Sequence, residues 1–185
     1  MLDFFPDYEA IHGEVHARIT DLPIADSLRD LRQVHLNALV KVTGVVTRRS
    51  GVFPKLKKGY YDCPACGFTL GPYAGSDFSV SSCPECQSER PAFAWKANEN
   101  RTVYVNLQKL TLQEAPGAVP PGRVPRHKDV FVEDDLIDRA RPGEEIEVTG
   151  AYVNEVYEQG LNNRHGFPVF STRIIANHIV KVLTD

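Results

Sequence analysis

Two cysteine pairs constrain the fold of this chain more than any other feature of its sequence. They are Cys63-Pro-Ala-Cys66 and Cys83-Pro-Glu-Cys86, and they contain all four cysteines of the 185 residues. Four thiolates in two C-x-x-C turns supply the closed tetrahedral shell that structural zinc prefers, with no open position for a catalytic water. The pattern predicts a zinc ribbon whose metal ligands are Cys63, Cys66, Cys83 and Cys86.

The alternative for these cysteines is a pair of disulfides or a redox dithiol, which would suit an oxidising compartment. The first ten residues, MLDFFPDYEA, have neither a basic start nor an apolar stretch, so we expect no secretory or mitochondrial leader. No apolar run approaches the ~20 residues of a membrane span, so we expect no membrane partner. Around the metal we expect a small apolar shell of Phe68, Leu70, Tyr73, Phe78, Phe93 and Trp95.

Alternating, β-branched sequence indicates a mainly β fold. Val42-Thr43-Gly44 is echoed by Val148-Thr149-Gly150, and a glycine inside a strand suggests a bulge or a sharp bend. A five-stranded OB-fold barrel uses such bends to close. We therefore predict an OB barrel with the zinc ribbon inserted, built from strands at Leu39–Arg48, Val103–Leu112, Glu145–Tyr152 and Pro168–Ile175.

A small helical part is also predicted. Apolar residues at helical spacing after Pro23 favour an amphipathic helix over Ile24–Leu36. Acids in the first turn, arginines in the last and a following Pro-Gly favour a short helix over Glu133–Pro142. The predicted parts are a helical remnant over 1–36, the barrel over 37–59 and 101–182, and the ribbon over 60–100.

Two long connections stand out. The stretch QEAPGAVPPGRVPRHK from Gln113 to Lys128 exceeds a plain connection, and it is either a surface strap in polyproline conformation or a functional loop. Tyr152–Phe170 is typical of a long hairpin that reverses near Gly160. Its tip could reach a ligand or a neighbour, or have no such role.

Charge is unevenly distributed, although the net charge is only −3. Lys41–Tyr60 holds six basic residues and no acid, whereas Glu133–Glu147 holds seven acids and two arginines. Clustered cations create local affinity for phosphate, but a basic run is often only a solvated face.

Nothing in the sequence predicts a catalytic residue. The phosphate-binding pattern G-x-x-x-x-G-K-[ST] does not occur, so we expect no ATP hydrolysis by this chain. The six histidines are scattered. His12 and His16 have helical i, i+4 spacing that could bind a metal, but no third ligand accompanies them. A free-standing zinc enzyme or a transcription-type zinc ribbon is therefore disfavoured.

Six ordered segments resemble one known family. From about Leu22 onward the chain is similar to the N-terminal region of eukaryotic subunits of the minichromosome maintenance (MCM) family of replicative DNA helicases. The segments are LRQVHLNALVKVTGVVTRR, YYDCPACGFTLGPY, SSCPECQS, LTLQEAPGAVPPGRVPRHKDV, PGEEIEVTGAY and NNRHGFPVFSTRIIANH.

The resemblance implies a platform for DNA binding and assembly in DNA replication licensing, initiation and elongation, in the nucleus. In that family the subunit joins five others in a heterohexameric ring around single- or double-stranded DNA, and two rings meet through their zinc tiers. The parent subunit would be an ATP-dependent helicase that binds ATP and Mg²⁺ in a motor domain absent from this sequence.

The resemblance also implies roles for particular residues. The hairpin would point into the ring's channel, although its tip carries only Arg164 and His165 as basic residues, fewer than in archaeal members. Gln113, Glu114, Pro116 and Gly117 would belong to the loop that couples the N-terminal tier to the motor. We expect DNA contacts from Arg48, Arg49, Lys55, Lys57, Lys58, Arg123, Arg126 and Arg164. The alternative is a pure subunit-assembly module without DNA affinity, whose basic and acidic surfaces face neighbouring subunits.

Overall fold

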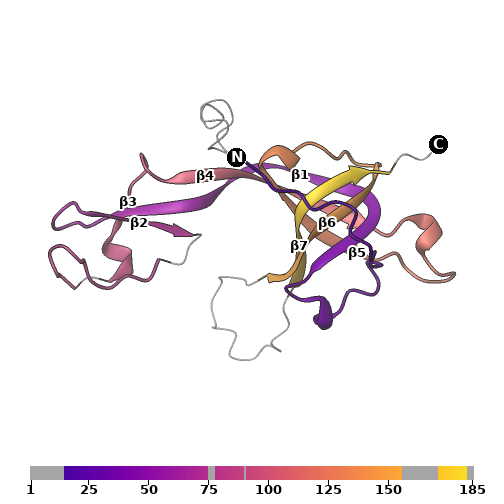
Figure 1. Ribbon diagram of the computed structural model, residues 1–185, viewed down its shortest axis with the longest axis horizontal. Helices are drawn as coiled ribbons and strands as arrows, with labels where there is room; N and C mark the ends of the chain where they lie inside the picture. Colours follow the sequence, from indigo (N-terminus) through magenta and orange to yellow (C-terminus); the bar gives the residue numbers. More distant parts are fainter. Residues whose placement is uncertain (1–14, 75–77, 90, 156–170, 183–185) are drawn as a thin grey trace. The chain divides into compact units, whose positions relative to one another are not determined.

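The computed structural model describes residues 15–74, 78–89, 91–155 and 171–182. Among these residues no helix is long and apolar enough to cross a membrane. The strands are β1 (Leu39–Asp62), β2 (Thr69–Ala74), β3 (Lys96–Ala97), β4 (Val103–Gln113), β5 (His127–Glu133), β6 (Glu145–Glu155) and β7 (Ser171–Lys181), with 3-10 helices η1 (Gln33–His35), η2 (Ala92–Ala94), η3 (Pro116–Ala118) and η4 (Asp134–Leu136). Figure 1 follows them along the chain.

The chain divides into two compact units. The barrel unit comprises Met1–Arg49, Leu110–Val132 and Asp138–Asp185, and the ribbon unit comprises Ser50–Lys109 and Glu133–Ile137. The strands β1 and β4 run through both units, because each division falls within a strand.

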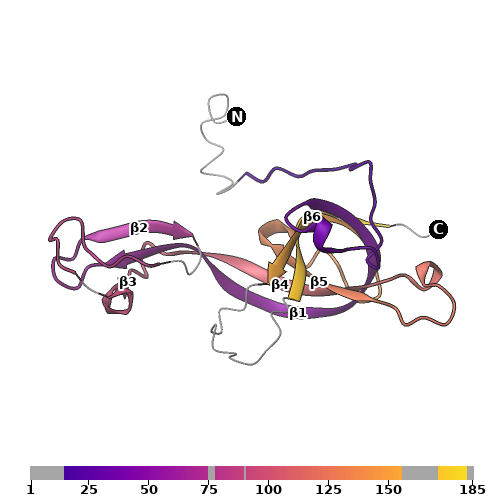
Figure 2. The same cartoon turned by 90° about the horizontal axis from the view of Figure 1, so that it is seen from below.

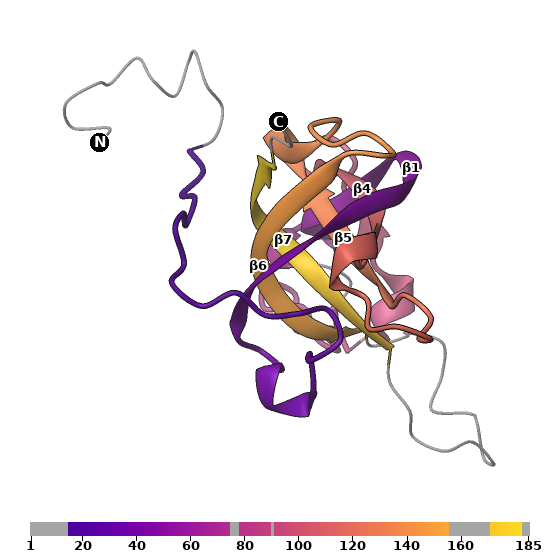
Figure 3. The ribbon, with the colours of Figure 1, turned by 90° about the vertical axis from the view of Figure 1, so that its right-hand side faces the viewer.

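Five strands close the barrel unit. The strand order β1-β4-β5-β7-β6 returns to its start because β6 also pairs with β1, and Figure 3 shows these strands around a common centre. The pairings β1–β6 and β6–β7 are antiparallel, and β5–β7 is parallel. The inward positions are fully buried aliphatic residues: Val40, Val42, Val46, Leu110, Leu112, Val130, Val132, Ile146, Val148 and Ile174. The predicted OB-fold barrel is confirmed.

The two echoed segments pair directly with each other, since Val42 lies opposite Val148. At Gly150 the β6–β7 register shifts, so the predicted bulge is present there. Gly44 pairs without a shift and instead allows a close backbone approach, because a Cβ there would lie 2.5 Å from the carbonyl oxygen of Gln113. The interior glycines thus serve two different purposes.

The helix predicted over Ile24–Leu36 is wrong, since only the single turn η1 forms there. The backbone of this segment bonds to the barrel instead: the Asp26 N–H donates to Lys41 O (2.7 Å) and the Asn37 N–H to Tyr152 O (2.7 Å). Leu28 and Leu31 are buried, which explains the apolar spacing without an α-helix.

The helix predicted over Glu133–Pro142 is also wrong. Only η4 forms, and Asp134 (φ 51°) and Asp138 (φ 59°) adopt left-handed backbone angles that an α-helix cannot contain. Glu133, the first residue of the predicted helix, instead ends β5, a strand that the sequence patterns did not reveal.

In the ribbon unit, β1 continues well beyond its predicted end at Arg48, through Pro54 to Asp62. Asp62 lies opposite Thr69 of β2 and opposite Lys96 of β3, so the end of β1 is flanked on both sides (Figure 2). The predicted hairpin over Tyr152–Phe170 has paired ends, with Glu155 opposite Ser171, and its tip lies outside the described residues.

Candidate functional site

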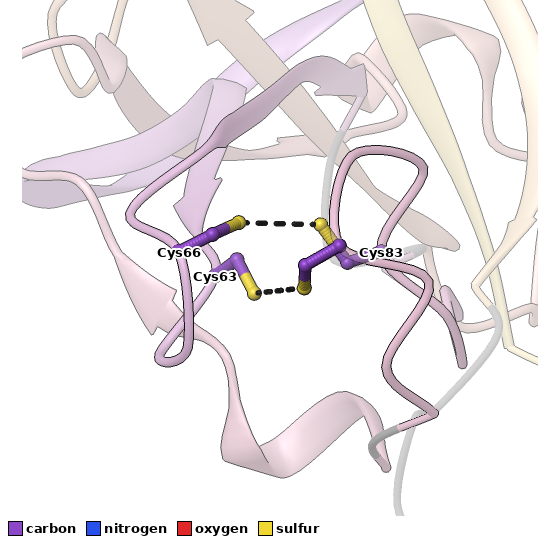
Figure 4. Close-up of side chains that lie close together, drawn as sticks. Cys63, Cys66 and Cys83 are labelled. Atoms are coloured by element: carbon purple, nitrogen blue, oxygen red, sulfur yellow. Dashed lines mark hydrogen bonds between the residues drawn. The ribbon is translucent and has the colours of Figure 1, made fainter.

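The four cysteines converge in the ribbon unit, and their sulfur atoms all lie within 4.8 Å of one another. The Cys63 and Cys86 sulfurs are 3.8 Å apart and those of Cys66 and Cys83 are 3.6 Å apart (Figure 4). A tetrahedral shell with Zn–S bonds of about 2.3 Å places its sulfurs about 3.8 Å apart. All four cysteines are free thiols, so they fit a tetrahedral metal ion and the disulfide alternative is not realised.

The two knuckles have matching backbone geometry. The Gly67 N–H donates to Cys63 O and the Gln87 N–H donates to Cys83 O, each at 2.9 Å. Gly67 (φ 73°) and Gln87 (φ 53°) both adopt the left-handed conformation four residues after the first cysteine of their knuckle. The same turn therefore presents two thiols twice, as the repeated C-x-x-C spacing predicts.

Hydrogen bonds favour the thiolate form of two ligands. The backbone N–H of Cys66 lowers the pKa of Cys63 below its ordinary value. The hydroxyl and backbone N–H of Ser88 lower the pKa of Cys86 to about 6. Because a metal binds the thiolate, these donors prepare the site for a cation.

An aromatic cluster supports the site. Cys63, Cys83 and Trp95 form its buried centre, and the Phe78 ring stacks on Tyr61 at a centroid distance of 3.9 Å. Of the expected shell, Leu70, Tyr73, Phe78 and Trp95 take part, whereas Phe68 is 39% exposed and the Phe93 side chain lies outside the described structure. Tyr61 and Val80 were missed, because neither stands beside a cysteine in the sequence.

The basic and acidic runs of the sequence contact each other within the chain. Three cation–carboxylate pairs join them: Arg49–Asp138 at 3.1 Å, Lys55–Glu133 at 2.7 Å and Lys41–Glu147 at 3.9 Å. Lys57 also has an interaction within the chain. Arg48 and Lys58 are exposed and form no ion pair with any described residue. Part of the basic run is therefore neutralised locally, and part remains available to an external anion.

Arg123 and Arg126 line a cavity of about 570 Å³ in the barrel unit. Arg29, His127 and Lys128 join them around it, above the buried side chains of Leu28 and Leu31. Arg29 was missed by sequence reasoning, because about 85 residues separate it from this loop. Arg164 and His12 lie outside the described residues, and the cysteines form the one metal-ligand cluster of the described part.

The loop between β4 and β5 contains Gln113, Glu114, Pro116 and Gly117. Gln113 ends β4, and Pro116 and Gly117 are exposed in η3. Glu114 is only 4% exposed and forms a 2.9 Å ion pair with Arg29. Within one short segment the structure therefore separates a buried acid from exposed loop residues.

Comparison with known proteins identifies relatives along nearly the whole chain. Residues 27–156 match the family model described as MCM OB domain. The DNA replication licensing factor MCM2 of Arabidopsis thaliana is 51% identical over 98% of the chain, that of Schizosaccharomyces pombe 53% over 95%, and that of Drosophila melanogaster 50% over 97%. MCM4 of Oryza sativa is 30% identical over 90% of the chain.

The chain spans about a fifth of the length of these relatives, namely 19% of the Arabidopsis protein and 21% of the fission yeast protein. The family model covers most of the barrel unit together with the ribbon unit, and the resemblance seen in the six sequence segments is confirmed. The chain belongs to the minichromosome maintenance family, with a sequence of the MCM2 type.

Proposed function

We propose that this chain is the N-terminal DNA-binding and assembly platform of a replicative DNA helicase subunit, acting in replication licensing, initiation and elongation in the nucleus. The observation that carries the proposal is an OB barrel with exposed cations in a chain about 50% identical to replication licensing factors. We propose a ring with five related subunits around single- or double-stranded DNA, and a second ring that docks through the zinc tier. ATP and Mg²⁺ would bind only to a motor domain of the parent, which would hydrolyse ATP.

We further propose that the metal is structural zinc. Four thiolates at tetrahedral spacing suit this ion, and no position remains for a reactive water. Cys63, Cys66, Cys83 and Cys86 would hold the ion, which would fix the two knuckles relative to each other.

DNA binding would be sequence-neutral and electrostatic. Arg48, Arg49, Lys55, Lys57, Lys58, Arg123, Arg126 and Arg164 are the proposed contacts, and Arg48, Lys58 and the cations around the 570 Å³ cavity are supported best because they are exposed. Lys and Arg that neutralise phosphates release counterions, so affinity falls steeply with salt.

A salt series with labelled single-stranded DNA and the zinc-loaded chain tests this proposal by fluorescence anisotropy. The double variant Arg48→Glu/Lys58→Glu should weaken binding and lower the slope of log Kd against log salt by about 2, one unit for each lost phosphate contact. Lys109→Glu/Lys181→Glu makes the same change in net charge on exposed residues outside the proposed set. Equal weakening by both pairs would reject a defined interface.

The second candidate is a pure assembly module without DNA affinity. It is favoured by the pairs Arg49–Asp138 and Lys55–Glu133, which occupy two proposed DNA contacts with carboxylates of the same chain. Salt-sensitive association with a neighbouring subunit, combined with no DNA binding at low salt, would support it.

The remaining assignments are also proposals. We propose residues 1–36 as the end of a helical subdomain, 37–59 with 101–182 as the barrel domain, and 60–100 as the zinc ribbon. The hairpin between β6 and β7 would face the channel. Gln113, Glu114, Pro116 and Gly117 would belong to a loop that couples this tier to the motor.

A further inference from the structure

The loop between β4 and β5 is closed at its base by backbone and side-chain hydrogen bonds. The Glu114 N–H donates to Arg126 O at 3.0 Å, and the Arg126 N–H donates to Glu114 Oε2 at 2.9 Å. Twelve positions apart in sequence, these two residues form the stem of the loop. The loop, residues 114–126, is therefore a closed segment and not an open connection.

Arg29 ties this stem to the chain that precedes β1. Its Nε donates to Glu114 Oε1 at 3.2 Å, and its Nη2 donates both to Glu114 Oε2 at 2.9 Å and to Val124 O at 3.0 Å. One guanidinium thus contacts both sides of the loop. A bidentate guanidinium–carboxylate pair has a fixed geometry, which a single lysine ammonium cannot reproduce.

The burial of this pair makes it all-or-none. The Glu114 side chain is 4% exposed and that of Arg29 is 16% exposed. A carboxylate in such a place is stable only while its donors remain, because removing one partner leaves an uncompensated buried charge. The loop residues that could meet another protein are elsewhere, since Pro116, Gly117 and Val124 are exposed and Val124 is 82% exposed.

We propose that Arg29 and Glu114 form a latch that fixes the position of the loop 114–126, so that Glu114 acts from inside the barrel unit and touches no partner domain. The inference rests on the proposed coupling role of this loop and deepens it. Glu114 and Arg29 are positioning residues, and the exposed part of the loop is the part that meets a partner. The state of the latch decides where that part lies.

Hydrogen exchange of the zinc-loaded chain tests the latch, with Arg29→Met and Glu114→Gln as variants that keep side-chain length. Exchange in the peptide 114–126 should be at least tenfold faster in each, and trypsin should cleave faster after Arg123 and Arg126. Exchange in β6 and β7 should stay unchanged, and the double variant should be no faster than either single variant. Arg29→Lys should fall between wild type and Arg29→Met.

A matched control is Lys181→Met, which removes the exposed 2.8 Å pair with Glu144 and should leave the loop unaffected. Unchanged loop exchange in folded Arg29→Met, or additive effects in the double variant, would overturn the latch. In the assembled parent complex, the same variants should reduce the stimulation of ATP hydrolysis by DNA at least threefold. Faster loop exchange with unaltered stimulation would reject the coupling role and leave the latch intact.

Discussion

The barrel unit and the ribbon unit are stabilised by different means. The barrel closes its own hydrogen bonds and buries ten aliphatic side chains to less than 2% exposure, whereas the buried centre of the ribbon consists of Cys63, Cys83 and Trp95. A core that small does not offset the entropy of ordering a unit of this length, so the ribbon needs a metal as a staple. One polypeptide thus joins a self-sufficient fold to a metal-dependent one.

The largest expected effect is the loss of a metal ligand. Cys63→Ser removes a buried thiolate, and structural zinc contributes about 10–16 kcal/mol in zinc-finger peptides, so the ribbon unit should unfold while the barrel persists. Limited proteolysis should cut the variant between residues 60 and 100 only. Glu85→Gln, an exposed change inside the second knuckle, is the control and should behave as wild type. Cooperative loss of both units would contradict their independence.

A core truncation in the barrel should have the next largest effect. Ile174 is completely buried in β7, and Ile174→Ala should lower the free energy of unfolding of the barrel by about 2–5 kcal/mol. Val180→Ala removes a 44% exposed side chain from the same strand and should cost less than about 0.5 kcal/mol. Urea denaturation followed by far-UV circular dichroism measures both, and similar costs would show that β7 does not contribute to the core as described.

A smaller effect is expected at the close backbone approach in β1. In Gly44→Ala the new Cβ would lie 2.5 Å from Gln113 O, so the backbone must shift at a cost of about 1–3 kcal/mol. Gly51→Ala is the matched change in the same strand, and its nearest neighbour is 4.0 Å away. Thermal denaturation should separate the two variants, and equal melting temperatures would show that the barrel relaxes freely around Gly44.

The smallest effect concerns pH. Burial opposes ionisation of Glu114, but the Arg126 N–H and the Arg29 guanidinium outweigh it and lower the pKa of Glu114 below its usual 4.5. A carboxyl group with a lowered pKa stabilises the folded state above its unfolded-state pKa and loses this contribution as pH falls through the folded-state value. Stability should therefore decline below about pH 4.5 more steeply in wild type than in Glu114→Gln. Parallel pH profiles of unfolding free energy would contradict this.

The two units also differ in how far sequence alone reveals them. The metal ligands follow from local spacing, since each C-x-x-C turn repeats the same backbone geometry. The barrel follows from alternation in β1, β4 and β6, where buried and exposed positions take turns. Both features are local patterns, and both were predicted correctly.

The errors arise where tertiary contacts override local preference. Leu28 and Leu31 have helical spacing, but their segment bonds to β1 and folds into turns. The acid-rich stretch after β5 is prevented from forming a helix by the positive φ angles of Asp134 and Asp138. The latch and the pairing of the basic and acidic runs join residues about 80 to 90 positions apart, which no local pattern can reveal.

The contrast between the two units can be tested most directly by removing the metal while watching two probes. Trp95 is the single tryptophan of the chain and lies in the ribbon core, so its fluorescence reports on that unit, while hydrogen exchange in β6 and β7 reports on the barrel. Chelation should shift the Trp95 emission to that of an exposed indole and leave exchange in β6 and β7 unchanged, and zinc should restore the emission. Unchanged Trp95 emission in the metal-free chain would contradict the claim that a metal holds the ribbon together.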